Sequence, residues 1–100
     1  MIFMILLMDR PGTAELRTTI RPAHRAYLAQ SADQMAFAGP LTSDDGQNTL
    51  GSLLMMDFPD RSSAQEWLKN EPFTVAGVYE PPVIHAFTNL WQQKVGFPPA

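Results

Sequence analysis

The sequence predicts a single α+β domain with a βαββαβ order of elements. Its 100 residues match the commonest domain size, so one hydrophobic core is expected. Two segments are apolar on both faces of an extended chain, as strands covered on both sides are. Two other segments show apolar residues at helical spacing. Between these two predicted helices lie two predicted strands joined by a turn.

The first half of the chain predicts a strand followed by a helix. Residues 1–8 are almost unbroken apolar sequence, and Pro11 and Gly12 then signal a turn. From residue 13 onward the apolar side chains recur at intervals of three and four, which predicts an amphipathic helix. Its apolar seam consists of Leu16, Ile20, Ala23 and Tyr27. Pro22 predicts a kink or a fresh helical start, because proline removes one helical hydrogen bond.

The second half predicts a hairpin, a helix and a last strand. Residues 35–41 and 49–58 read as strands joined by a polar turn at 44–48. Asp60 is placed to cap a helix that Pro72 ends, and residues 83–91 form the last strand. The tail, residues 92–100, is expected to be irregular. The strands at 1–8 and 49–58 are expected to be central, which is the ferredoxin-like arrangement.

Such a sheet predicts a homodimer. Two helices cover only one face, and the other face would remain a large apolar patch in water. Pairing with a second copy, sheet to sheet, is the simplest cover.

Composition limits the partners and the compartment. The formal net charge is −3, and no basic run is present that could neutralise a phosphate backbone, so nucleic acid is excluded as a partner. The apolar start is too short to span a bilayer, so no membrane partner is expected. The absence of cysteine suits a cytoplasmic protein.

His24 is the first candidate for chemistry. On a helical wheel Arg17, Arg21 and His24 share one side, next to the apolar seam. A histidine at the border of the core, beside two arginines, would face a half-buried space that suits an anion or a carboxylate. The alternative is a border histidine that bonds a backbone carbonyl, and spacing alone leaves both open.

Glu71 is the second candidate. It follows the second predicted helix at once, where the negative end of the helix dipole disfavours a carboxylate, so a partner is expected to hold it. With His24 it could form a base and the carboxylate that orients it. The alternative is a solvated loop glutamate.

Four further residues are candidate contacts to a small-molecule ligand. Arg17 and Arg21 flank His24 on its helix, and Ser52 is a hydrogen-bond donor on a central strand. His85 shares one face of the last strand with aromatic residues, and that face would line either a pocket or the space between two copies. His24, His85 and Glu71 lack the spacing of a metal motif, and no phosphate loop occurs, so neither metal nor cofactor is expected.

Four short motifs, in order, resemble the YCII-related (YciI-like) family. They are Arg21-Pro22-Ala23-His24-Arg25-Ala26-Tyr27-Leu28, Ala38-Gly39-Pro40-Leu41, Gly51-Ser52-Leu53-Leu54, and Glu71-Pro72-Phe73 with Ala76-Gly77-Val78-Tyr79. The resemblance covers nearly the whole chain and implies a ferredoxin-like fold that pairs as a dimeric α/β barrel, with a pocket near a histidine and an acid. His24 matches the family histidine, and Glu71 stands where the family typically has aspartate. One family member is a dehydrochlorinase of a chlorinated hydroxyhydroquinone.

Two functions remain open at this stage. The first is a cofactor-free lyase or dehydrochlorinase-type enzyme, in which His24 moves a proton, Glu71 orients it, and Arg21 or Ser52 steadies negative charge on a small aromatic or anionic substrate. The second is a non-catalytic module that binds a metabolite in the same pocket. The geometry of His24 and Glu71 around an open cavity distinguishes them.

Overall fold

A four-stranded antiparallel sheet forms one layer of the protein. The computed structural model describes residues 1–91. The strands are β1 (Ile2–Met8), β2 (Met35–Thr42), β3 (Thr49–Asp57) and β4 (Val83–Phe87). Their order across the sheet is β2-β3-β1-β4, so β1 and β3 are central, as their two-sided apolar character predicts.

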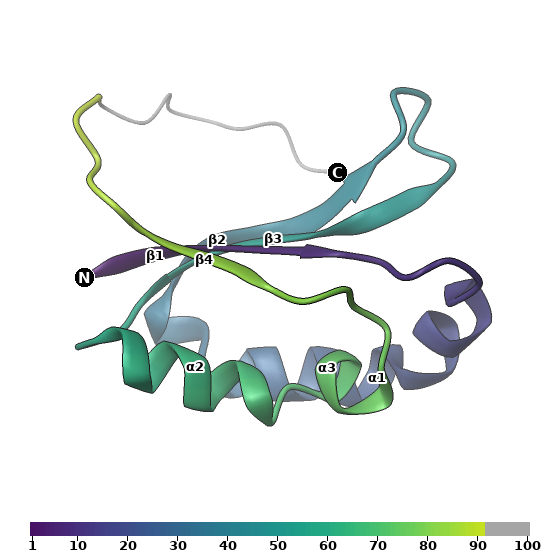
Figure 1. Cartoon of the computed structure of the whole chain (residues 1–100), viewed down its shortest axis with the longest axis horizontal. Coiled ribbons are helices and arrows are strands. Elements are labelled where there is room, and N and C mark those ends of the chain that lie inside the picture. The colour runs from purple at the N-terminus through teal and green to yellow at the C-terminus, as the bar shows by residue number, and fades with distance from the viewer. Residues whose placement is uncertain (92–100) are drawn as a thin grey trace.

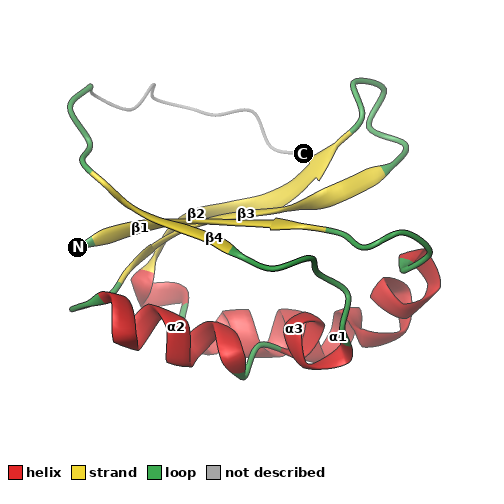
Figure 2. Ribbon diagram, in the orientation of Figure 1, coloured by secondary structure: helices red, strands yellow, loops and turns green. Residues whose placement is uncertain are grey.

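The helices form a second layer on one face of that sheet (Figures 1 and 2). They are α1 (Ala14–Gln30), α2 (Arg61–Lys69) and the short α3 (Pro72–Ala76), with a 3-10 turn, η1 (Ala32–Gln34), between α1 and β2. This is the ferredoxin-like α+β fold that the element order predicts. The additional helix α3 was not predicted, and it turns out to position the candidate site.

The core lies between the two layers. Alternate residues of β1 point at the helices, and Phe3, Ile5 and Leu7 are each no more than 1% exposed. The register pairs Ile5 with Leu54 and Leu7 with Ser52, so these β3 residues share the helix-facing side. Burial of each large apolar side chain contributes roughly 1.5–3 kcal/mol. Ser52 is thus a polar residue set into an apolar layer.

Helix α1 runs through Pro22 as one continuous helix, so of the two expectations the fresh helical start is wrong. Pro22 is exposed, so it lies on the solvent side of the helix. The carbonyl that loses its hydrogen bond there can bond water. Meanwhile Leu16 and Ile20 before the proline, and Leu28 after it, pack against the core. Tertiary packing on both sides therefore outweighs the local cost of the proline.

Helix α2 begins as its sequence predicts and is tied to α1. The Asp60 carboxylate accepts a hydrogen bond from the backbone N–H of Ser63 at 2.7 Å, which caps the helix. At its other end the Trp67 carbonyl accepts a hydrogen bond from the Tyr27 hydroxyl at 2.7 Å. The two rings pack with centroids 5.2 Å apart. This contact fixes α1 and α2 side by side.

The C-terminal strand is shorter than predicted. β4 ends at Phe87, whereas alternation in the sequence had carried it to residue 91. Among residues 1–91 it pairs with β1 alone, from Leu6 to Ile2, and the last pair of this register joins Ile2 to Phe87. The predicted irregular tail, residues 92–100, lies outside the described residues. Within residues 1–91 no helix has the length and apolar character needed to cross a membrane.

Candidate functional site

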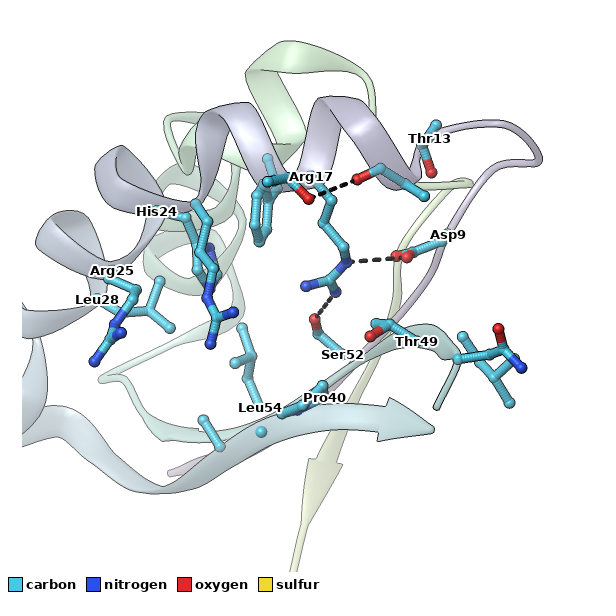
Figure 3. Close-up of a pocket in the computed structure, with 18 of the residues that line it drawn as sticks. Asp9, Thr13, Arg17, His24, Arg25, Leu28, Pro40, Thr49, Ser52 and Leu54 are labelled. Atoms are coloured by element: carbon cyan, nitrogen blue, oxygen red, sulfur yellow. Dashed lines mark hydrogen bonds and ion pairs between the residues drawn. The ribbon is translucent and has the colours of Figure 1, made fainter. Parts of the chain in front are cut away.

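A cleft of about 1070 Å³ lies between α1 and the β2–β3 side of the sheet (Figure 3). Helix α1 supplies Arg17, Arg21, His24 and Arg25 to its wall, and β3 supplies Ser52. The floor includes Leu54 and the ring of Phe73. The cleft thus gathers charged groups of one helix over a largely apolar floor.

His24 and Glu71 meet although 47 residues separate them in the sequence. The His24 Nδ1 lies 2.5 Å from the Glu71 Oε1. A carboxylate in that position accepts a hydrogen bond from Nδ1–H, and a neutral imidazole in this tautomer keeps its lone pair on the other ring nitrogen, Nε2. The His24 side chain is 14% exposed and lines the cleft, whereas Glu71 is fully buried behind it. The arrangement therefore presents an oriented imidazole to the cleft.

Glu71 is held by the start of helix α3, which corrects the expectation that a helix dipole disfavours it. It is the N-cap of α3, and its Oε1 and Oε2 accept hydrogen bonds from the backbone N–H groups of Phe73 (3.1 Å) and Thr74 (3.0 Å). The Thr74 hydroxyl adds a third, to Oε2 at 3.3 Å. At this end of a helix the orphan N–H groups favour a carboxylate. These hydrogen bonds stabilise the buried Glu71 carboxylate in addition to its contact with His24.

The ring of Phe73 fixes two cationic or basic groups of α1. The imidazole of His24 stacks on it, with ring centroids 4.0 Å apart and an angle of 19° between the planes. The guanidinium carbon of Arg17 lies 4.7 Å from the centroid of the same ring. Contacts of a cation with an aromatic face contribute about 0.5–2 kcal/mol, more as water is removed. Phe73 thus sets the positions of His24 and Arg17 relative to each other.

Arg17 donates hydrogen bonds to both Asp9 and Ser52 at the wall of the cleft, as Figure 3 shows. Its Nε donates to the Asp9 Oδ2 at 2.9 Å, and a terminal nitrogen donates to the Ser52 Oγ at 2.6 Å. The guanidinium therefore makes a single hydrogen bond to the Asp9 carboxylate and not a bidentate ion pair. The Asp9 Oδ1 is buried without a hydrogen-bond partner among the described residues. Arg17 is therefore a fixed, charge-compensated donor at the wall.

Tyr79 completes this network from beneath. Its hydroxyl lies 3.1 Å from the Ser52 Oγ. Burial raises the pKa of Tyr79 to about 12, while the hydrogen bond with Ser52 works in the opposite direction. The phenol therefore stays protonated at neutral pH and can donate to Ser52. Since Arg17 also donates to the Ser52 oxygen, the serine's own proton is then free to point into the cleft.

Tyr79 predicts a pH dependence of stability. Its pKa is raised from 10.0 to about 12 in the folded protein, so between these pH values the unfolded chain loses the phenolic proton and the folded chain keeps it. Stability that is complete below pH 10 is then lost as pH rises toward 12, by about 2 kcal/mol. Denaturant titrations of wild type and Tyr79→Phe at neutral and alkaline pH measure the difference. Equal alkaline losses in the two proteins would contradict the assignment.

The structure brings most of the predicted site residues together. Arg17, Arg21, His24 and Ser52 line the cleft, and Glu71 supports His24 from behind. His85 does not join them, because it pairs in register with Met4 on the sheet face away from the helices. No three metal-binding side chains cluster anywhere in residues 1–91.

Sequence reasoning missed Asp9 and Tyr79. An isolated bridge pairs the two residues beyond the end of β1, so that Asp9 lines the cleft and the Tyr79 hydroxyl reaches Ser52. In the sequence Asp9 looked like a turn residue beside Pro11 and Gly12. The one usable signal for Asp9 was its position directly after a buried strand, where a carboxylate needs a partner. For Tyr79 the sequence offers only a motif, because its contact with Ser52 spans 27 residues.

Comparison with known proteins agrees with this architecture. The model of the YCII-related domain matches residues 1–88. The chain belongs to the YCII-related family. Protein YciI of Escherichia coli is 30% identical over 98 aligned residues, which cover 91% of this chain and all of that relative. An uncharacterised protein of Haemophilus influenzae is 29% identical over the same share of both chains.

A solved structure supports the fold independently. It is 5-chloro-2-hydroxyhydroquinone dehydrochlorinase from Burkholderia phenoliruptrix, in complex with 2,5-dihydroxybenzoquinone. It superposes with a TM-score of 0.81 at 29% identity, covering 88% of this chain and 94% of that chain. The ferredoxin-like fold of the dimeric α/β barrel type is therefore the fold of this YCII-related chain.

Proposed function

We propose that this YCII-related protein is a cofactor-free enzyme that moves a proton in a lyase reaction, of the dehydrochlorinase type. One observation supports this most directly: the imidazole of His24 is held by a buried, fully hydrogen-bonded carboxylate and faces an open cleft. A histidine with only a structural role does not need that orientation toward a cavity. The dehydrochlorinase activity of a structural relative gives the reaction class.

The proposed reaction removes a proton and a leaving group from a hydroxylated, conjugated ring. The His24 Nε2 takes a proton from a substrate hydroxyl and delivers it to the ring carbon that carries the leaving group, which gives a keto tautomer with a tetrahedral carbon. A second hydroxyl then loses its proton, its electron pair moves through the conjugated system to form a carbonyl, and the leaving group departs from the tetrahedral carbon as an anion. For a chlorinated substrate the balance is loss of HCl, with no oxidant or reductant. Glu71 stabilises the imidazolium that forms, and Arg17 and Ser52 are placed to donate hydrogen bonds to the substrate oxygens.

Chloride release tests this proposal. The purified protein is incubated with 5-chloro-2-hydroxyhydroquinone, and chloride is measured against buffer and against a matched Lys69→Gln protein. Lys69 lies on α2, outside the cleft. We expect both proteins to release chloride faster than buffer. Saturable binding of 2,5-dihydroxybenzoquinone without any chloride release would instead favour a non-catalytic binding module.

The proposal extends to a cytoplasmic homodimer paired through the open sheet face. That face carries Met4 and Leu6 of β1, Leu53 of β3, and two strongly exposed side chains of β4, Val83 (40%) and Phe87 (47%). The helices of residues 1–91 cannot cover them within one chain, because they lie on the other face (Figure 2).

A lysine on the open face should therefore prevent pairing. Leu53→Lys would place an unpaired charge in the proposed interface, which costs far more than an exposed lysine. Sedimentation of the wild type at micromolar concentration is expected to give twice the monomer mass, and the variant is expected to sediment as a monomer. Gln65→Lys, on the exposed side of α2, is the matched control and should stay dimeric. A monomeric wild type contradicts the proposed pairing.

A further inference from the structure

Positive charge is concentrated at the cleft. Four arginines line it, namely Arg10, Arg17, Arg21 and Arg25, out of seven lysines and arginines in the whole chain. The protein as a whole carries a net charge of −3, so this concentration runs against its overall balance. Such local fields raise the concentration of oppositely charged ligands near a site.

The acidic side chains near the cleft already have partners other than Arg21 and Arg25. Asp9 is the one acidic side chain among the described residues of the lining, and it pairs with Arg17 at 2.9 Å. Glu71 lies behind His24, and its carboxylate is bound to His24 and to the start of α3. Two cations therefore remain uncompensated on α1: no ion pair with Arg21 or Arg25 forms among residues 1–91.

The spacing of these arginines is unfavourable for the helix itself. Arg17, Arg21 and Arg25 follow one another at intervals of four residues, so each lies one turn from the next on the same side of α1. Like charges at that spacing weaken a helix by a few tenths of a kcal/mol for each pair. His24 lies on this side as well, and Figure 3 shows Arg25 and His24 on the same helix above the cleft. An anion bound between the arginines would remove the repulsion.

From this placement we infer that the cleft binds small dianions more tightly than neutral or singly charged molecules of the same size. One anionic group, a carboxylate or a phosphate, is held by Arg21 and Arg25, and the part that reacts lies at His24 and Ser52. Guanidinium groups suit this role, because their planar fork binds carboxylate and phosphate oxygens in pairs. The inference deepens the proposed function and rests on it for the location of the reacting part.

Matched probes with the same ring test the inference. Benzamide carries no negative charge, benzoate carries one, and isophthalate and phenyl phosphate each carry two. The two dianions distinguish a pair of carboxylates from a single phosphate. Binding is followed by the amide NMR shifts of α1 and by calorimetry. We expect the dianions to bind roughly tenfold to a hundredfold more tightly than benzoate, and the difference to shrink in high salt.

Variants assign the effect to the cleft. Arg21→Gln and Arg25→Gln should each remove most of the preference for dianions. Lys69→Gln, which removes one positive charge from α2 outside the cleft, should leave it intact. Equal binding of benzoate and the dianions, no binding of any probe, or an equal loss in Lys69→Gln would overturn the inference. His24→Ala separates the two claims, because dianion binding should survive in it while turnover should not.

Discussion

Replacing His24 with alanine is expected to reduce turnover by about 10²–10⁴-fold, which is the usual contribution of a positioned general base. His24 lines the cleft, and the bond from its Nδ1 to Glu71 leaves Nε2 as the atom that can accept a proton. Alanine supplies no proton acceptor, and the void it leaves could admit imidazole. The measurement is the rate of chloride release with and without added imidazole, and partial recovery is expected with it.

The same variant should remain folded and paired. Alanine favours helix, and Glu71 keeps its three donors from α3. The stacking on Phe73 is lost, at a cost on the order of 1 kcal/mol. Leu16→Ala, in the seam packed against the core, is the comparison and should cost roughly 2–4 kcal/mol. A His24→Ala protein that is as unstable as Leu16→Ala, or one with unchanged turnover, would refute the role of His24.

The sequence was sufficient to predict the sheet, because the burial of a strand can be predicted from its local pattern of apolar and polar residues. Residues 1–8 and 49–58 are apolar on both faces, and the structure places the corresponding strands at the centre. Gly39 and Pro40 likewise mark β2, which lies at an edge. Periodicity also gave the side of α1 that carries Arg17, Arg21 and His24. These features depend on short spacings, which one sequence reports directly.

The site depended on contacts that short spacings cannot report. The helix that follows Glu71 is only five residues long, and periodicity needs a longer window to detect one. Without it, Glu71 looked like a carboxylate at the wrong end of a helix dipole. His85 shows the same limit: alternation gave Val83 and Phe87 as its neighbours on one strand face, but only the register with Met4 reveals that this face lies away from the helices.

Replacing Glu71 should affect stability and chemistry together, because one buried carboxylate serves both. Glu71→Ala removes the acceptor for two backbone N–H groups of α3 and for His24 Nδ1. Unpaired buried donors cost about 1–3 kcal/mol each, so we expect a loss of roughly 2–4 kcal/mol, with partial relief from water. Glu66→Ala, which removes an exposed acid of α2, is the matched control and should change stability by less than about 0.5 kcal/mol.

Glu71→Asp distinguishes a role in orientation from a role in folding alone. Aspartate is a favourable N-cap, so α3 should keep its start and most of the lost stability should return. Nitrogen NMR of the His24 side chain reports which ring nitrogen carries the proton. We expect the Nδ1–H tautomer to dominate in wild type and in Glu71→Asp, and to lose its preference in Glu71→Ala, with turnover following the tautomer. If turnover instead follows only the folded fraction across the three proteins, Glu71 caps α3 and does not orient His24.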